Sequence, residues 1–292
     1  YTPAIGLDFD SISVRAERLE DHKQLTLRSA YADGEITGKY LFRHFRRTAM
    51  GFIQHYLPAS VDKDTPAAST PDNDFSFDLR LKKMHQVLAV FLPEINMADQ
   101  GHLQGHFRSE PPSLELDLEM DHLGFKNIES SEIRVRARAN ESDGLSLVTR
   151  AGNLRMGKLA DLYNFSVHQR AQNDSLRTNI FWNNWDLETY SGALYSTTHF
   201  TRDADQERHT AIHLQPSSIL VADSIWQISE SQLTFYKKVM SVRDFRIQHQ
   251  NQFVRLHGFL HREVPDGLQL LFNQLNVDQF LQPKADSKIT FG

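Results

Sequence analysis

The sequence predicts a mainly-β protein: an elongated, curved antiparallel or mixed β-sheet with one or two short helices. Strand-like runs, in which apolar and polar residues alternate, follow one another through most of the 292 residues. Alternating runs at a spacing of roughly 8 to 12 residues are typical of all-β folds. Short clusters rich in Gly, Asp, Asn, Ser and Pro, such as ANESDG and VPDG, separate the runs and mark the turns between strands.

The clearest strand is SLELDLEMD at 113–121. Successive side chains of a strand point to opposite faces, so one face of this strand carries only large apolar residues, namely Leu114, Leu116, Leu118 and Met120. Full burial of one such side chain stabilises a protein by about 1.5 to 3 kcal/mol. We therefore expect an apolar cover over this face, which a core, a partner or a lipid could provide.

The polar face of the same strand predicts its neighbour. Its acidic row is followed in the sequence by a basic row on an alternating strand, the two rows being Glu115, Asp117, Glu119 and Arg134, Arg136, Arg138. We expect the two strands to pair, although two unrelated solvated faces remain the alternative. Opposed charges contribute only about 0.2 to 1 kcal/mol per pair, so they would set the register while the apolar face carries the stability.

Helical periodicity occurs in two segments. YLFRHFRRTAMGFIQHYLP at 40–58 places an apolar stripe on one side and ends at Pro58, and the predicted stripe is Leu41, Phe45, Met50, Ile53 and Leu57. A weaker helix or turn is expected from Met84 to Leu92. Between them, residues 58–74 lack large apolar side chains, which predicts a mobile loop. We expect the helix and this loop to interrupt the sheet.

Glycines inside three strand patterns indicate curvature. DGEITGKYLF at 33, QGHLQGHFRS at 100 and FVRLHGFLHR at 253 each place Gly within a strand, shortly before an apolar or aromatic residue. Gly inside a strand often marks a bulge or a bend. The spacing of the three segments is too irregular to indicate a solenoid.

Composition excludes several classes of function. The chain is 40% apolar and 24% charged, with a net charge of -5, and it contains no cysteine, so disulfide frameworks, thiolate metal sites and cysteine nucleophiles are excluded. The slightly acidic balance without a basic block argues against nucleic-acid binding, and the nearest candidate, RHFRR at 43–47, is too short. No apolar run approaches the ~20 residues that span a bilayer, and no signal peptide is evident. The chain lacks an initiator Met and begins and ends in alternating runs, so we expect it to be a piece of a longer protein that holds a membrane anchor elsewhere.

No motif predicts an enzyme or a bound cofactor. His102 and His106 share a strand face but lack a nearby third metal ligand, and His209 and His213 are similar, so exposed strand histidines explain both pairs better than a metal site. The chain has no phosphate-binding loop, dinucleotide fingerprint, nucleophile elbow or HExxH motif. We therefore expect a protein that is not an enzyme, with no catalytic residues, no metal and no cofactor.

An aromatic group in NIFWNNWDLETY allows a second interpretation. Exposed Trp and Tyr beside Asn and Asp can stack on sugars, and this group comprises Phe181, Trp182, Trp185 and Tyr190. Trp182, however, continues the alternation of Leu176, Thr178 and Ile180, which favours an inward position.

A family resemblance narrows the function. In PSSILVADSIWQISESQLTFYKKVMSVRDFRIQHQNQFVRLHGFLHREVPDGLQLLFNQLNVDQF at 216–280, a short strand leads to an Asp-Ser-x-Trp turn at 223–226, followed by Gln-Leu-x-Phe, Val-x-x-Phe-x-Ile and Leu-x-Leu-x-Phe-x-x-Leu-x-Val segments. This stretch resembles the repeated units of the TamB family, the translocation and assembly module proteins of the AsmA-like group, in their Bacteroidota form. LPEINMADQGHLQGHFRSEPPSLELDLEMDHLGFKNI at 92–128 is similar to the middle region of that family.

The resemblance implies a long, periplasmic cell-envelope protein that is anchored in the inner membrane, with an outer-membrane barrel of the BamA superfamily, TamA-like, as its partner. It also implies a taco-shaped or half-pipe sheet whose apolar concave face carries phospholipid acyl chains, or supports assembly of outer-membrane proteins. The expected organisation is strands plus a helix at about 40–57 within 1–57, a flexible loop over 58–74 and a continuous TamB-like sheet over 75–292.

A groove of this kind needs a continuous apolar strip and no catalytic residue. By alternation, the candidates for this strip are Leu114, Leu116, Leu118, Met120, Ile133, Val135, Leu145, Leu147, Phe165, Val167, Leu176, Ile180, Phe245 and Ile247. An ordinary packed core explains each of them equally well. Two other functions stay open: a scaffold that adds nascent strands to a free sheet edge, and a carbohydrate-binding or adhesion domain.

Overall fold

The computed structural model describes most of the chain. The described ranges are 12–18, 20, 22–41, 43, 45–61, 72–92, 94–97, 100–157, 160–184, 190–221, 224–261 and 267–274. Most of the loop expected at 58–74, as well as Trp185 and Asp223, lies outside these ranges.

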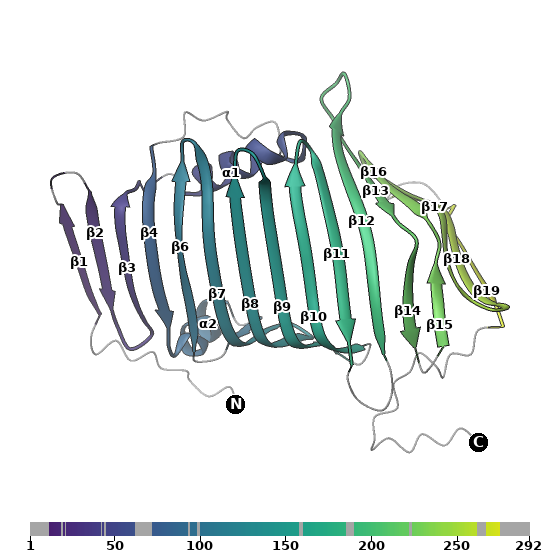
Figure 1. Ribbon diagram of the computed structural model, residues 1–292, viewed down its shortest axis with the longest axis horizontal. Helices are drawn as coiled ribbons and strands as arrows, with labels where there is room; N and C mark the ends of the chain where they lie inside the picture. Colours follow the sequence, from purple (N-terminus) through teal and green to yellow (C-terminus); the bar gives the residue numbers. More distant parts are fainter. Residues whose placement is uncertain are drawn as a thin grey trace, which may run out of the picture.

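The described residues form one 19-stranded antiparallel sheet, in which most strands pair with the next strand along the chain, while β4 pairs with β6, β5 with β7, β12 with β14, β13 with β16 and β15 with β17 (Figure 1). The fold class expected from the sequence is therefore confirmed. The N-terminal strands are β1 Ser13–Arg18, β2 Lys23–Arg28, β3 Ala32–Lys39, β4 Asp74–Leu81, β5 Ile95–Met97, β6 Gly101–Ser109, β7 Pro112–Phe125, β8 Ile128–Asn140, β9 Gly144–Met156 and β10 Ala160–Gln172. The C-terminal strands are β11 Ser175–Asn183, β12 Ser191–Arg202, β13 Arg208–Leu214, β14 Ser217–Val221, β15 Ser224–Ile228, β16 Ser231–Tyr236, β17 Val239–His249, β18 Gln252–His261 and β19 Gln269–Asn273.

The expected pairing of the acidic and basic rows is confirmed. In the β7–β8 ladder Glu115 lies opposite Arg138, Asp117 opposite Arg136 and Glu119 opposite Arg134. The same register places Leu116 opposite Ala137 and Leu118 opposite Val135. The charged rows thus lie on one face of the sheet and the apolar rows on the other.

The helical segment does not interrupt the sheet, contrary to the expectation from the sequence. β3 pairs directly with β4 from Ala32 opposite Leu81 to Lys39 opposite Asp74, although the helix and the loop separate these strands in the sequence. The insertion contains α1 Phe45–Tyr56 and the short 3-10 helix η2 Pro58–Ser60. A second helix, α2 Met84–Phe91, connects β4 to β5 and confirms the weaker prediction at 84–92.

The apolar stripe predicted for the first helix is only partly correct. The residues of α1 that are buried are Thr48, Phe52 and Tyr56, at a spacing of four, whereas Ile53 and the preceding Leu41 are exposed. Leu57, just after the helix, is buried as predicted. The rings of Phe52 and Tyr56 pack in a cluster with Ala139 and Ala171 of the sheet, so the aromatic side of the helix faces the sheet.

Bends in the sheet occur where the ladders are irregular. Glu132 on β8 and Asn164 on β10 have positive φ angles of 51° and 48°. Gly152 on β9 lies beside Glu132, and a Cβ at this glycine would approach the Glu132 carboxylate to 2.8 Å. Between β17 and β18 a register shift lies at Val242/Phe245, next to Gly258 with φ +120°. The bend predicted at this glycine is therefore confirmed, and Figure 1 shows the C-terminal strands turning away from the plane of the others.

The Asp-Ser-x-Trp segment differs from the expected turn. Ser224–Ile228 forms strand β15, and Trp226 within it is fully buried. In the ladder, Trp226 lies directly opposite Ile219 of β14. The tryptophan therefore belongs to the packed interior of the sheet rather than to a connection.

Candidate functional site

The fourteen groove candidates all lie on one face of the sheet. Directly opposite residues in an antiparallel ladder point to the same side, so the registers can be followed from strand to strand. Leu116 of β7 lies opposite Ala137 of β8, which lies opposite Leu147 of β9. Leu145 of β9 lies opposite Ala171 of β10, which lies opposite Leu176 of β11. Further ladders carry the same face to Phe245 and Ile247 on β17. We call this surface the apolar face.

Helix α1 covers one end of the apolar face. Phe52, Tyr56 and Leu57 pack with Ala139 and Ala171, and the surrounding contacts come from Phe107, Leu114, Leu145, Leu176 and Phe200. The ring centroids of Phe52 and Phe107 are 5.4 Å apart. Aromatic and aliphatic side chains thus pack the helix onto the sheet.

Hydrogen bonds fasten the C-terminal end of α1 to the rim of the sheet. Asp174, in the β10–β11 turn, accepts a hydrogen bond from the Ala59 backbone N–H at 2.6 Å, and its own N–H donates to the Tyr56 carbonyl at 3.2 Å. The Tyr56 hydroxyl donates to the Asn140 carbonyl at 3.3 Å, and burial raises the pKa of this phenol. Arg208 Nη1 donates to the Ser60 carbonyl at 2.8 Å. These contacts fix the position of α1 over the strand ends.

Helix α2 covers the opposite end of the same strands (Figure 1). Its Met84 and Leu88 pack against a cluster formed by Met97, Met120 and Ile133. Leu81, Leu118 and Val135 also contact this cluster. Four of the groove candidates, Leu118, Met120, Ile133 and Val135, therefore belong to a packed layer beneath α2.

Between the sheet and α1 lies an apolar trough of about 570 Å³. Its floor includes Leu116, Leu147 and Leu103, and its roof includes Phe52 and Ile53. The remaining lining residues are Ile36, Tyr40, Leu41, Thr48, Ala49, Asn73, Phe75, Phe77, Leu79, Phe107, Leu114, Ala137 and Leu145. Only Tyr40, Thr48 and Asn73 among them carry polar side chains, so the trough offers almost no hydrogen-bonding partner to a ligand.

The trough contains four of the residues predicted from the sequence: Leu114, Leu116, Leu145 and Leu147. Leu176 packs under α1, while Phe165, Val167 and Ile180 lie farther along the apolar face and are partly exposed. Phe245 and Ile247 lie on β17, far along the sheet from the trough. Sequence reasoning missed Phe75, Phe77, Leu79 and Leu103, although the alternation in FSFDLRL pointed to three of them.

Glycines make room for aromatic rings on this face. Gly105 lies opposite Phe77, and a Cβ there would come within 2.7 Å of the Phe77 ring. Gly192 lies opposite Trp182, and a Cβ there would come within 2.1 Å of the indole. Both rings thus lie flat over a neighbouring strand. The inward position predicted for Trp182 is confirmed, because this indole shares the apolar face with Ile180.

The other face of the sheet is polar and internally paired. Arg136 Nε and Arg138 Nη2 donate to the Asp117 carboxylate at 2.8 Å and 2.6 Å. These hydrogen bonds, that of Arg136 first, hold the pKa of Asp117 below its ordinary value of 3.8. The two predicted strand histidines also contact carboxylates here, His102 with Asp78 at 3.1 Å and His106 with Asp74 at 3.0 Å.

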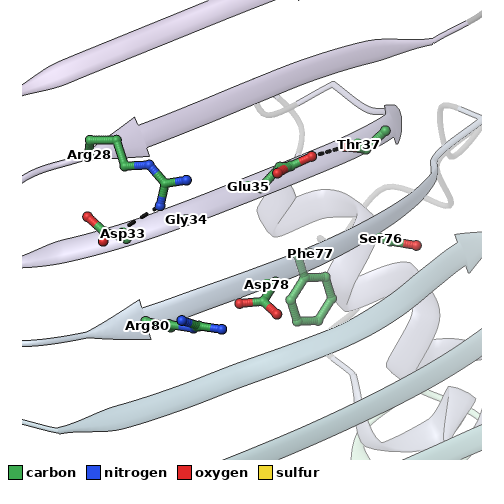
Figure 2. A pocket seen from close by; sticks show the side chains of 9 residues that line it. All are labelled: Arg28, Asp33, Gly34, Glu35, Thr37, Ser76, Phe77, Asp78 and Arg80. Carbon is green, nitrogen blue, oxygen red and sulfur yellow. Dashed lines mark hydrogen bonds and ion pairs between the residues drawn. The ribbon is translucent and has the colours of Figure 1, made fainter.

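A second hollow, of about 390 Å³, lies on strands β2, β3 and β4 (Figure 2). Charged side chains of both signs line it: Arg28, Asp33, Glu35, Asp78 and Arg80. Asp33 contacts Lys82 at 2.8 Å and Arg28 at 3.6 Å, and the hydrogen bond from Lys82 lowers the pKa of this carboxyl. Within this lining Arg28 pairs with Asp33, and Glu35 accepts a hydrogen bond from Thr37, so several of its polar groups already have partners.

The described residues include neither a metal-binding cluster nor a membrane-spanning helix, and the chain matches no known protein. Among the described residues no cluster of three or more His, Cys, Asp or Glu is placed to hold a metal ion. Neither of the described helices has the length and hydropathy required to cross a membrane. The sequence matches no protein-family model, and neither the curated proteins nor the solved structures contain a chain that matches it.

Proposed function

We propose that this protein is a non-enzymatic module of a TamB-like protein of the cell envelope, and that its apolar face shields phospholipid acyl chains in transit. The observation that carries the proposal is the trough of about 570 Å³, whose lining is nearly all apolar. Its size falls within the roughly 300 to 1,000 Å³ of small-molecule sites. A ligand with many polar groups would lose its hydrogen bonds to water there, at a cost of about 1 to 3 kcal/mol for each unpaired group.

An acyl chain is the ligand whose chemistry fits this lining. Each methylene transferred from water contributes about 0.8 kcal/mol, so eight methylenes contribute about 6 kcal/mol before the entropic cost of binding. Backbone groups of the sheet are already paired along the ladders, so the floor presents side chains only. The apolar face also extends beyond the trough along many neighbouring strands, which supports movement of a chain along the sheet.

The wider setting is part of the same proposal. A TamB-like role places the full-length protein in the periplasm, anchored in the inner membrane, with a TamA-like barrel of the BamA superfamily as its partner. Support for this setting comes from the sequence resemblance and from the curved β-sheet with one apolar face, which is the architecture that the resemblance implies.

The test compares Leu116→Glu with Ser146→Glu. Leu116 lies on the floor of the trough, and Ser146 lies on the polar face of β9, where it is directly opposite Arg138 and Arg170. Both variants gain one negative charge, but only the first places it where acyl chains would lie. We expect Leu116→Glu to weaken binding of a fluorescent fatty acid at least about tenfold, because an unpaired carboxylate in an apolar site is strongly unfavourable.

Ser146→Glu should bind the fatty acid as the wild type does, and circular dichroism should show that both variants are folded. If the wild type does not bind fatty acid, or if the two variants bind it equally, the lipid-shielding function is wrong. A protein that acts by adding strands at a sheet edge would tolerate both changes.

A further inference from the structure

Two cations lie side by side on the apolar face near the trough. Arg18, at the end of β1, is directly opposite Lys23, at the start of β2, and Lys23 is directly opposite Gly38 of β3. The next two rows of the ladder on the same face are Ala16 with Leu25 and Val14 with Leu27, so both cations belong to the apolar face. Both cations therefore occupy positions at which the alternation of these strands predicts apolar side chains.

Neither cation forms an ion pair within the described part of the chain, and the strand residues around them explain why. On the apolar face, β1, β2 and β3 carry Val, Ala, Leu, Ile and Gly beside the two cations, and no carboxylate. Glu20, in the following turn, is an exposed residue. On the polar face of the same strands, by contrast, Arg15 pairs with Glu17 and Arg28 with Asp33.

Lys23 lies against the wall of the trough. Its Nζ is 3.4 Å from the Tyr40 carbonyl oxygen and 5.7 Å from the centroid of the Tyr40 ring. Tyr40 lines the trough and packs edge-on against Phe75, another lining residue, with ring centroids 6.1 Å apart. Lys23 therefore places a positive charge beside Tyr40, at the edge of the trough nearest β2 and β3.

Like charges directly opposite each other in a ladder destabilise a sheet. An anion bound between Arg18 and Lys23 would relieve that repulsion and form charge-assisted hydrogen bonds with both side chains. We propose that Arg18 and Lys23 bind the phosphate of a phospholipid whose acyl chains occupy the trough, and that the site therefore prefers net-anionic phospholipids. This inference rests on the proposed function, since it assigns the headgroup end of the same ligand.

The test measures affinity for three fluorescent lipids with identical acyl chains: phosphatidylglycerol, phosphatidylethanolamine and diacylglycerol. The variant is Arg18→Gln with Lys23→Gln. Its control is Arg15→Gln with Lys39→Gln, which removes the same charge from exposed cations that pair with Glu17 and Asp72. The wild type should bind phosphatidylglycerol about tenfold more tightly than diacylglycerol, as two partly screened charge contacts would give.

In the Arg18/Lys23 variant the affinity for phosphatidylglycerol should fall to that for diacylglycerol, while diacylglycerol binding stays unchanged. The control variant should retain the preference, and the preference of the wild type should weaken between 0.05 and 0.5 M salt, chosen because the Debye length shortens from about 14 to 4 Å. Phosphatidylethanolamine should fall between the other two lipids.

Three results would overturn the headgroup site. One is equal wild-type affinity for phosphatidylglycerol and diacylglycerol, a result that would still agree with binding of acyl chains in the trough. The second is an equal loss of preference in both double variants. The third is displacement of the lipid by low-millimolar inorganic phosphate, which would mean that the cations bind a free anion. Failure of all three lipids to bind would instead remove the proposed function itself.

Discussion

The two ends of the sheet share one pattern of alternation but differ in what lies over the apolar face. Over β6 to β10, α1 and α2 cover the ends of the strands. Phe52 of α1 is buried against the sheet, and Met120 of β7 is buried beneath α2. Over β16 to β19, no described helix covers the same face. Several large apolar residues of these strands are exposed on this face: Phe235 by 40%, Leu270 by 51% and Phe272 by 59%.

The difference teaches that alternation determines which face is apolar, but not what covers it. In the helix-covered part, burial of apolar side chains contributes to the stability of the protein. In the C-terminal part, the same kind of side chain remains available for contact with something else. A protein that only needed a core would leave the second surface without a role, whereas a surface for acyl chains uses both parts.

The largest expected effect comes from Phe52→Ala compared with Phe272→Ala. Phe52 is 8% exposed and packs against Tyr56 and Phe107, so removal of its ring leaves a cavity between α1 and the sheet. We expect the free energy of unfolding, measured by urea denaturation, to fall by about 3 kcal/mol. Phe272→Ala should change it by less than about 0.5 kcal/mol, because the ring is already in water. Equal losses would mean that an unseen layer covers the C-terminal strands.

A smaller effect is expected on the polar face, from Asp117→Asn compared with Asp244→Asn. Asp117 accepts hydrogen bonds from two arginines, whereas Asp244 meets Arg255 at 3.4 Å with both side chains exposed. Because the folded-state pKa of Asp117 is lowered, its carboxylate stabilises the protein above the unfolded value of 3.8, and this contribution is lost as the pH falls through and below that value.

Asp117→Asn should therefore lower the free energy of unfolding by about 0.5 to 1 kcal/mol near pH 6 and change it little near pH 3. Asp244→Asn should have no measurable effect at either pH. A deficit for Asp117→Asn that persists unchanged at pH 3 would contradict the assigned ion pairs. Urea denaturation at the two pH values provides the measurement.

Much of the fold followed from local physics. Strict alternation identified the strands, and the facing acidic and basic rows gave the pairing of β7 with β8, because both signals act between neighbouring residues or adjacent strands. The helices were located by periodicity and by Pro58. The stripe of α1 was partly misassigned because aliphatic residues were favoured over Phe52 and Tyr56, and only the shape of the floor at Ala139 and Ala171 decides between them.

The site was predictable as a face but not as a trough. All fourteen candidates share the apolar face, since register propagates alternation from strand to strand. The sequence could not show that α1 folds back over Leu116 and Leu147 while α2 covers Met120, because those contacts join residues far apart in the chain. The expected break in the sheet was wrong for the same reason: β3 and β4 pair across the whole helical insertion.

The central claim is that the trough beneath α1 holds acyl chains. It is tested most directly by photocrosslinking with a phospholipid that carries a diazirine near the end of one acyl chain, followed by mass spectrometry of the adducts. We expect adducts on residues that line the trough, above all Leu103, Leu116 and Leu147, and their loss when an unlabelled fatty acid competes. Adducts confined to the exposed residues of β16 to β19, or labelling that a competitor does not reduce, would contradict it.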